Sequence, residues 1–400
     1  MSRGPGASDP PLRCNFIDGV EAIEKYRPGG YHPIAIGDVL HKRYRIVDKL
    51  GFVHQEIKAL KALSLPLSPS SSIHPGRSLI PTPLDEFELH GPNGTHPCYT
   101  MAPARCNLSE VSYSRLFPLE VARALCFGLT QAVAYTHSQG YVHGDIHLRN
   151  VLVGLPRAFH ELSVQQLYDE YGEPETVPVT PIDGSSLPPN VPPTAVVPLY
   201  LGKDAEEFTL SDTRVLLSDF GELFALKSEA RHARDCHTPL AMRPPESRFE
   251  PASLLSYSAD IWSLATAIWE IIGMKAIFSS EFATPDEVTS QQINVLGPMP
   301  AAWWEGWEAK YTFFDENGHP KQGTYPWPPL AEAFEDGVQK YRRKFQAGIF
   351  DQEETSAILD LVRRMLAFEP EKRPTAEEVL ESEWMVKWAQ PDFKRSLGCQ

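Results

Sequence analysis

The chain has 400 residues, 42% of them hydrophobic and 10% aromatic, which suits a folded globular protein with room for two lobes. Its 52 acidic residues outnumber the 37 basic ones, and the net charge of -15 argues against direct binding to nucleic acid or an anionic membrane. The six cysteines have no CxxC or paired spacing, and no apolar run approaches the roughly 20 residues of a membrane span. We therefore expect a soluble intracellular protein without disulfides, a zinc site, a signal peptide or a membrane segment.

The first hundred residues contain mostly β signals. Residues 1–30 are rich in Gly, Pro and Ser and are predicted to be a flexible tail. The stretch YRIVDKLGFVHQEIKALKAL at 44–63 predicts a strand that reaches Gly51, followed almost at once by a helix. Residues 81–103 predict a hairpin, because two apolar stretches flank the turn sequence GPNG.

The rest of the chain is mainly helical. A helix is predicted from Pro118 to a C-terminal glycine at Gly140, and a short strand is predicted at 151–153. Residues 155–210 form a proline-rich insertion with little expected regular structure. The segment SADIWSLATAIWEIIG at 258–273 is apolar nearly all round, which predicts a helix at the centre of a helical lobe.

Two acidic motifs carry the chemistry. In HGDIHLRN, Asp145 and Asn150 lie five residues apart on one loop, and in SDFGE, Asp219 follows an apolar strand. Phosphoryl transfer needs one carboxylate to orient the attacking hydroxyl, and it needs oxygen ligands that hold Mg²⁺ against the phosphates. Either motif alone is weak evidence, whereas both together, each beside an apolar strand, indicate a phosphotransferase.

At these motifs the chain resembles a protein kinase. HGDIHLRN is similar to the catalytic loop, DFG follows it, and RPPE stands where the activation segment closes. DIWSLA and FEPEKRPTAEEVLESEWM are similar to the central helix and the closing helical segment. Within the kinases the chain most resembles the SR-protein kinase group, especially its fungal members, through YHPIAIGDVLHKRYRIVDKLGF, GPNGTH and the position of the insertion.

This resemblance implies a bilobal α+β kinase fold with a β-rich N-lobe and a helical C-lobe. It implies an ATP- and Mg²⁺-dependent serine/threonine protein kinase (EC 2.7.11.1 type) that phosphorylates arginine/serine-rich proteins, acts as a monomer and works in cytoplasm and nucleus. The catalytic residues would be Asp145, His147 and Asn150, and the metal ligands Asn150 and Asp219. ATP would contact Gly51, Asp219 and the hinge residues Met101, Ala102 and Pro103. Structural roles, including a buried spine of Leu60, His143 and Phe220 and a pair between Arg373 and Glu246, would fall to Glu56, Leu60, His143, Phe220, Gly221, Glu246, Asp260 and Arg373.

The catalytic loop departs from the family pattern at two positions. Gly144 replaces the usual arginine, so no cation at that position waits for a phosphorylated activation loop. His147 replaces the usual lysine, and its positive charge near neutral pH is only partial.

The largest departure lies in the N-lobe. In the family, Gly51 would open a glycine-rich loop, and two strands would follow before Glu56, the second carrying the lysine that grips the phosphates. Here only four residues separate Gly51 from Glu56, whereas two strands with their turns need roughly 15 residues. The glycine loop and the lysine strand are therefore absent, and we expect weak nucleotide binding and slow or undetectable transfer.

The expected organisation is a tail (1–30), a truncated N-lobe (31–103), a C-lobe (104–390) containing the insertion, and a C-terminal tail (391–400). Two other functions stay open. A pseudokinase that only binds basic partners is favoured by the missing lysine, and a small-molecule phosphotransferase is suggested by the likeness of HGDIHLRN to the loop of aminoglycoside and choline kinases. The PPE motif and the DIWSLA helix argue against the second of these.

Overall fold

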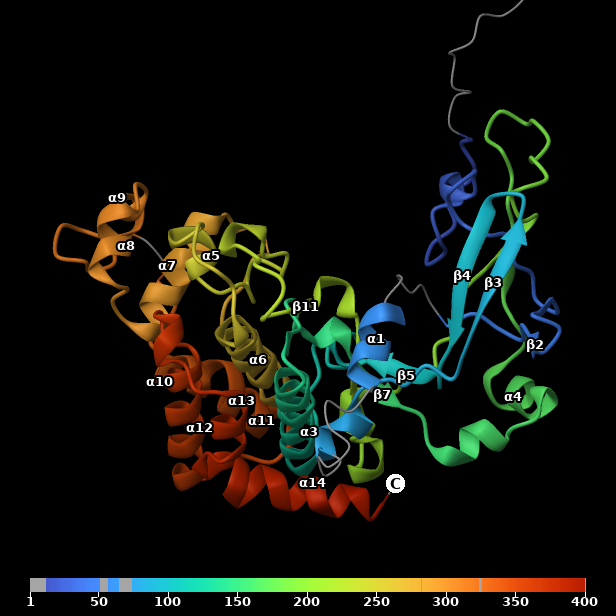
Figure 1. Ribbon diagram of the computed structural model, residues 1–400. Helices are drawn as coiled ribbons and strands as arrows, with labels where there is room; N and C mark the ends of the chain where they lie inside the picture. The colour runs from blue at the N-terminus through green and yellow to red at the C-terminus, as the bar shows by residue number, and fades with distance from the viewer. Residues whose placement is uncertain (1–11, 51–56, 65–73, 282, 324–325, 400) are drawn as a thin grey trace, which may run out of the picture. The chain divides into compact units, whose positions relative to one another are not determined.

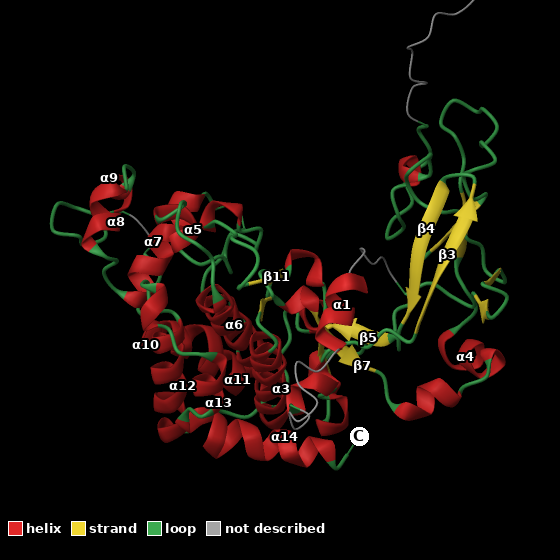
Figure 2. Cartoon of the chain, in the orientation of Figure 1, coloured by secondary structure: helices red, strands yellow, loops and turns green. Residues whose placement is uncertain are grey.

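The computed structural model describes residues 12–50, 57–64, 74–281, 283–323 and 326–399, and these form two units (Figure 1). Unit 1 takes its residues from Met1–His54, Pro83–Ala102 and Ala158–Leu201. Unit 2 takes its residues from Gln55–Thr82, Pro103–Arg157 and Gly202–Gln400. The fold is the expected mixture of small sheets and a predominantly helical unit (Figure 2).

Unit 1 is built on the predicted hairpin. Strands β3 and β4 pair antiparallel, with Phe87 opposite Cys98. The turn between them follows the GPNG signal, and Gly94 has a φ of +126°, which favours glycine. The elements of unit 1 are β1 (Val39–Leu40), β2 (Tyr44–Arg45), β3 (Asp85–Gly91), β4 (Gly94–Thr100), α4 (Val164–Tyr171), β8 (Thr176–Pro178) and β9 (Thr194–Val196).

The proline-rich insertion supplies three of the five buried residues in one hydrophobic cluster of unit 1. Ile23 and Tyr26 are buried in one cluster with Val179, Val191 and Ala195 of the insertion. The tail expected at 1–30 is therefore packed from residue 12 onward. The insertion is also more regular than expected, because β8 and β9 pair with each other and α4 begins with a capping box at Ser163.

Unit 2 contains a three-stranded antiparallel sheet, in the order β10–β7–β5. It also contains most of the helices (Figure 1). Its strands are β5 (Ala104–Asn107), β6 (Tyr141–Val142), β7 (Val151–Gly154), β10 (Val215–Leu217) and β11 (Phe224–Ala225). Its helices are α1 (Ile57–Ser64), α2 (Leu108–Val111), α3 (Leu119–Ser138), α5 (Glu246–Phe249), α6 (Tyr257–Ile272), α7 (Pro285–Leu296), α8 (Ala301–Gly306), α9 (Lys310–Phe313), α10 (Leu330–Phe334), α11 (Lys340–Phe345), α12 (Gln352–Met365), α13 (Ala376–Leu380) and α14 (Gln390–Leu397).

Helices α3 and α6 form the centre of unit 2 and confirm the two strongest helix predictions. They pack against each other, and nearly all their side chains are buried, as the apolar sequence of α6 requires. Gly140 follows the C-terminus of α3 with a φ of +84°, as the sequence predicts.

Three boundaries differ from the expected organisation. Helix α1 belongs to unit 2, because Leu60 and Leu63 are buried there and the Tyr135 hydroxyl donates to the Leu63 carbonyl. The insertion belongs to unit 1 over Ala158–Leu201. The C-terminal tail expected at 391–400 is mostly helix α14, which packs on α3, because Phe393 is buried and Asp392 pairs with Arg123.

The strand predicted from Tyr44 towards Gly51 is shorter than expected. It covers only β2, Tyr44–Arg45, and Leu50 is 46% exposed. A strand needs a neighbour for its backbone groups, and within the described part of the chain β2 pairs with the two-residue β1 alone. Among the described residues, no helix is long and apolar enough to cross a membrane.

Candidate active site

Asp260 at the start of α6 holds the backbone of the loop that follows β6. Its carboxylate accepts the N–H of His143 at 2.8 Å and the N–H of Gly144 at 2.9 Å, and it lies 2.9 Å from His137 Nε2. Burial alone would raise the pKa of Asp260, but the hydrogen bonds from His137 and from the Gly144 N–H keep it below its usual value. The ionised Asp260 carboxylate therefore holds the backbone of this loop through two hydrogen bonds, which is a structural role of the kind predicted for it.

His143 connects this loop to the DFG segment. Its Nε2 donates to the Ser218 carbonyl at 3.1 Å, and its Nδ1 accepts the N–H of Asp145 at 3.2 Å. Burial lowers its pKa, so the ring is neutral at pH 7. The ring also packs on Phe220 at 5.0 Å between centroids. Leu60, His143 and Phe220 are all buried, as the predicted spine requires.

Asp145, His147 and Asn150 lie together on the loop. Asn150 Nδ2 donates to the Asp145 carbonyl at 2.9 Å and to Asp145 Oδ2 at 3.1 Å. His147 Nε2 lies 3.4 Å from the same Oδ2. The other oxygen, Asp145 Oδ1, is buried without a hydrogen-bond partner among the described residues. An unsatisfied carboxylate oxygen is the acceptor that a substrate hydroxyl needs.

Strand pairing brings Asp219 beside Asn150. β7 and β10 are antiparallel with Val151 opposite Leu217, and Ser218 N–H donates to the Asn150 carbonyl at 2.9 Å. Asp219 follows with a φ of +59°, and its Oδ1 accepts the N–H of Gly221 at 3.4 Å. The left-handed backbone turns the chain sharply at the point where the DFG segment begins.

These side chains fit a magnesium ion. Asn150 directs its amide nitrogen to Asp145, so its Oδ1 accepts no hydrogen bond from the described residues. The same holds for Asp219 Oδ2. One amide oxygen and one carboxylate oxygen are hard ligands that suit Mg²⁺ when phosphates and water supply the others.

Comparison with known proteins supports the resemblance to protein kinases that the sequence motifs show. The family model described as "Protein kinase domain" matches residues 206–385. A serine/threonine protein kinase of Aspergillus fumigatus is 25% identical over 96% of this chain and 96% of its own length. Residues 206–385 are therefore similar to a protein kinase domain, and the relatives that span most of the chain are serine/threonine protein kinases. The serine/threonine-protein kinase SRPK of Physarum polycephalum is 23% identical over 92% of the chain and 91% of that protein. A crystal structure of the PF14_0431 kinase domain shares the fold, with a TM-score of 0.50, 15% identity and 82% coverage of both chains.

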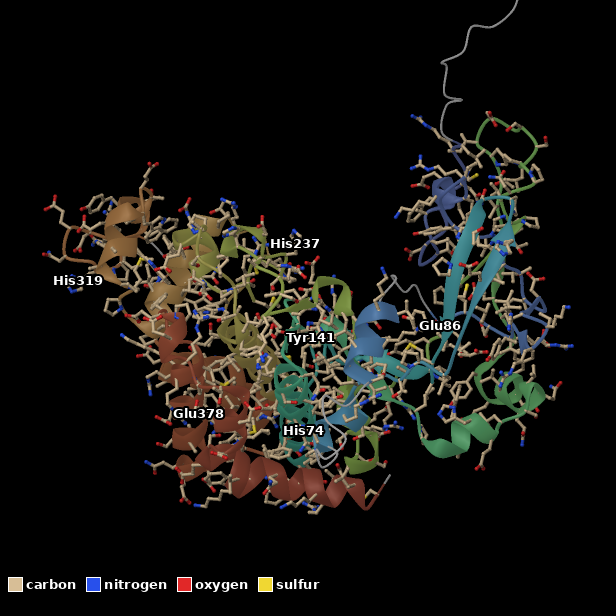
Figure 3. The ribbon with its side chains drawn as sticks, in the orientation of Figure 1. His74, Glu86, Tyr141, His237, His319 and Glu378 are labelled. Atoms are coloured by element: carbon tan, nitrogen blue, oxygen red, sulfur yellow. The ribbon has the colours of Figure 1, made fainter. Side chains whose placement is uncertain are left out.

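The segment between the DFG and RPPE motifs, which corresponds to a kinase activation segment, contains ion pairs between its own residues. Arg231 donates to the Glu222 carbonyl at 2.7 Å and to Glu222 Oε2 at 2.8 Å, and its guanidinium lies over the Phe224 ring. His237, which Figure 3 labels, has Nδ1 2.9 Å from Glu222 Oε1. Glu222 therefore gathers two basic side chains within the segment.

The predicted pair that closes the activation segment is present. Arg373 donates to both oxygens of Glu246, at 2.8 and 2.6 Å, and both side chains are buried. The guanidinium also lies over the Trp262 ring. A bidentate buried pair of this kind fixes the base of the segment to the helical core.

The glycine at position 144 has a local structural reason. Its φ is +81°, and a Cβ there would lie 2.9 Å from the Glu222 carbonyl oxygen. An arginine at this position would therefore push the catalytic loop away from the activation segment.

Several predicted nucleotide contacts are not placed at this site. Gly51 and Glu56 lie outside the described residues. Met101 and Ala102 end their segment of unit 1 and Pro103 begins the next segment of unit 2, so their role at the adenine edge stays a prediction.

Sequence reasoning missed Thr238 and Arg231. Thr238 is buried, and its Oγ1 donates to the Gly144 carbonyl at 2.8 Å, which links the activation segment to the catalytic loop. Thr238 stands in no repeated or charged pattern, and Arg231 is one of several charged residues in EARHARD at 229–235, with nothing to distinguish it from its neighbours. The position of Thr238 eight residues before Glu246 was the only signal available.

Proposed function

We propose that this chain descends from an ATP-dependent protein kinase that transfers the γ-phosphate of ATP to serine in arginine/serine-rich proteins. The observation that carries the proposal is the arrangement of Asp145, Asn150 and Asp219 around one loop whose backbone is fixed by Asp260.

Each residue has a defined part in the proposed transfer. Asp145 would accept a hydrogen bond from the serine hydroxyl through its unsatisfied Oδ1 and orient the oxygen for attack. Asn150 and Asp219 would hold Mg²⁺, which when bound supplies positive charge to the phosphate oxygens. His147 would stand beside the transferred phosphate in place of the usual lysine.

The substrate class rests on relatives and on charge. Relatives over most of the chain include the kinase SRPK of Physarum polycephalum and the protein kinase dsk1 of Schizosaccharomyces pombe, which is 23% identical over 94% of this chain. The net charge of -15 favours basic partners. We also propose a monomer that acts in cytoplasm and nucleus, to be checked by light scattering and by imaging of a tagged chain.

We further propose that the chain as it stands is impaired. The four residues between Gly51 and Glu56 leave no room for the glycine loop and the lysine strand. In support, the alignment with the Aspergillus fumigatus kinase spans 431 positions, more than the 400 residues of the chain, so that relative has segments without a counterpart here. Loss of two charge-assisted contacts to the phosphates would weaken binding or raise the barrier by about 3–6 kcal/mol. A pseudokinase that binds basic partners is the alternative that this gap favours.

The test combines calorimetric titration of the chain with Mg·ATP and a phosphorylation assay on arginine/serine peptides. We expect weak binding and slow or undetectable transfer, and clear transfer after a kinase glycine-loop and lysine-strand segment is inserted between Gly51 and Glu56. In that restored chain Asp145→Ala should lose most of its rate with ATP binding nearly unchanged. Micromolar binding with turnover near about 1 per second in the original chain would overturn the proposed impairment. A restored chain that binds ATP and still transfers nothing would favour the pseudokinase.

A further inference from the structure

Two neighbouring histidines of unit 1 each have a buried ring nitrogen without a hydrogen-bond partner among the described residues. The atoms are Nδ1 of His32 and Nε2 of His96. The two rings lie side by side, with 5.0 Å between their centroids and 61° between their planes. A buried nitrogen of this kind is uncommon, because it has lost its hydrogen bonds to water and gained none within the protein. One partner bound between the rings could satisfy both nitrogens.

The hairpin is shaped to receive the ring of His32. Gly91 ends β3, and a Cβ at that position would lie 2.2 Å from Cε1 and 2.7 Å from Nδ1 of His32. The φ of Gly91 is not positive, so the absence of a side chain, and not backbone freedom, is what makes room for the ring. His96 on β4 is opposite Leu89, two residues before Gly91, so its side chain lies on the same face of the hairpin as the His32 ring.

The spacing of the two rings fits one zinc ion. Two imidazoles bound to a tetrahedral ion through Zn–N bonds of about 2.0–2.1 Å hold their ring centres about 5 Å apart, and the observed centroid distance is 5.0 Å. Rings stacked face to face could not both direct an edge nitrogen to one ion, whereas an inclination of 61° allows it. Burial and the adjacent His96 lower the pKa of His32, so its ring is neutral at pH 7, which is the form of imidazole that binds a metal.

We propose that His32 and His96 bind a zinc ion through these two nitrogens. No third His, Cys, Asp or Glu completes a cluster with them among the residues that the structure describes, so water would fill the remaining positions. Two protein ligands hold zinc less tightly than the four of a closed structural site, and a chelator should therefore remove the ion. The cysteine spacing, which predicts no zinc site, has no bearing on this one, because neither ligand is a cysteine.

The ion would join the N-terminal segment of unit 1 to its hairpin. His32 and His96 are far apart in the sequence but belong to the same unit. Within the described part of the chain, β3 and β4 pair with each other alone, and an isolated two-stranded hairpin is barely stable in water. Small structures with little apolar core are often stabilised by a bound metal. Zinc would therefore stabilise unit 1, whether or not the chain transfers phosphate.

The experiment uses the full chain after treatment with EDTA and removal of the chelator. Zinc chloride is titrated in by calorimetry, and hydrogen exchange is followed with and without zinc. The variants His32→Gln and His96→Gln keep a polar side chain and lose the imidazole. His90→Gln is the matched control, because His90 is an exposed histidine of the same hairpin whose Nδ1 lies 2.9 Å from Thr95 Oγ1.

The proposal predicts a local and specific response to zinc. With free zinc at about ten times its Kd, the wild type should exchange about tenfold more slowly in β3, β4 and the residues next to His32, because opening then requires release of the ion. His32→Gln and His96→Gln should each weaken zinc binding at least about tenfold, since even the loss of a contact outside the ligand shell commonly costs that factor. Both variants should also lose the slowed exchange, and His90→Gln should behave as the wild type.

An equal response to zinc in the wild type and His96→Gln would overturn the proposal. So would zinc-dependent slowing confined to unit 2, or no zinc binding by the wild type. Zinc held by free thiols would persist in both variants and is distinguished in this way. If circular dichroism shows that a variant folds poorly, the wild type decides alone, because slowing near His32 and in β4 supports the site and slowing elsewhere contradicts it.

Discussion

At the scale of single residues, the pair between Arg373 and Glu246 is the interaction whose loss should be most costly. Both side chains are buried, and removal of one leaves the other charged and without a partner. Arg373→Ala should lower the free energy of unfolding by about 3–5 kcal/mol, measured by urea denaturation. The neighbouring Lys372 pairs with Glu369 on the surface, where solvent screens the pair, so Lys372→Ala should have little effect on stability. Similar losses of stability in the two variants would show that the buried pair between Arg373 and Glu246 does not anchor the activation segment to the helical core.

Gly144 offers a second test, because its positive φ and its contact with Glu222 can be separated. Gly140 has nearly the same φ, +84° against +81°, but a Cβ there would meet nothing within 4 Å. Gly140→Ala should therefore show backbone strain alone, about 1–2 kcal/mol. Gly144→Ala should lose more and should raise hydrogen exchange in both the catalytic loop and residues 222–238. Equal losses would mean that the Glu222 contact is relieved without cost.

Glu270 should make stability depend on pH. Burial raises its pKa from 4.5 to about 7 in the folded state, so between these values the folded chain holds a proton that the unfolded chain releases. The free energy of unfolding contributed by this group is therefore lost as pH rises through this window, by about 3 kcal/mol in all. Compared with the wild type, Glu270→Gln should gain that amount at pH 8 and nothing near pH 4.5, with denaturation curves as the measurement. Parallel pH profiles would show that Glu270 is well hydrated.

At the scale of elements, Asn93 joins three segments of unit 1. Its side chain is buried in the hairpin turn, donates to the carbonyls of Tyr31 and Asn190, and accepts from the Asn190 amide. Asn93→Ala should leave these groups unsatisfied, cost about 1–3 kcal/mol and speed hydrogen exchange across β3, β4 and the insertion. Asn15→Ala removes exposed bonds to the same insertion and should have a much smaller effect. Unchanged exchange in Asn93→Ala would mean that the three segments hold together without it.

The sequence predicted the position of those elements that are determined by a local pattern of residues. Helix α6 is apolar on all faces and α3 ends before a glycine, so both could be placed almost to the residue. The hairpin followed from its turn sequence. The shortened β2 could not be predicted, because strand length depends on partners that lie elsewhere in the chain. Helix α14 was missed because its sequence is polar, and its place depends on Arg123, which binds both Asp392 and Glu354.

The central residues of the candidate site could also be predicted from local sequence pattern. Asp145, Asn150 and Asp219 stand in two short motifs, each beside an apolar strand, and the pairing of β7 with β10 brings the motifs together. Thr238 and Arg231 lie in irregular backbone and Glu222 lies in a single 3₁₀ turn, where contacts are set by the folded chain and leave no periodic signal.

At the scale of the whole molecule, unit 2 should fold without the insertion, and unit 1 should not. Gly154 N–H bonds to the Arg214 carbonyl at 2.8 Å, so the chain leaves β7 and returns to β10 at one place. Replacement of Ala158–Leu201 by a short glycine/serine linker should leave slow hydrogen exchange in α3 and α6. The same change should abolish protection in β3 and β4, because Val179, Val191 and Ala195 are removed from the core of unit 1. Persistent protection of β3 and β4 would show that the insertion does not stabilise the hairpin of unit 1.

The insertion is also, in terms of polymer physics, the loop of a single hairpin. Strands β7 and β10 are its two arms, and the residues next to those arms are Asn150 and Asp219. Closing a loop of roughly 60 residues instead of one of about eight costs only about 2 kcal/mol of chain entropy, since each doubling of length costs about 0.6 kcal/mol. This loss of chain entropy is offset by the pairing of the two strands, whatever sequence the loop has. Mutation could therefore lengthen, shorten or rewrite this segment while the two oxygen ligands at its base keep their places.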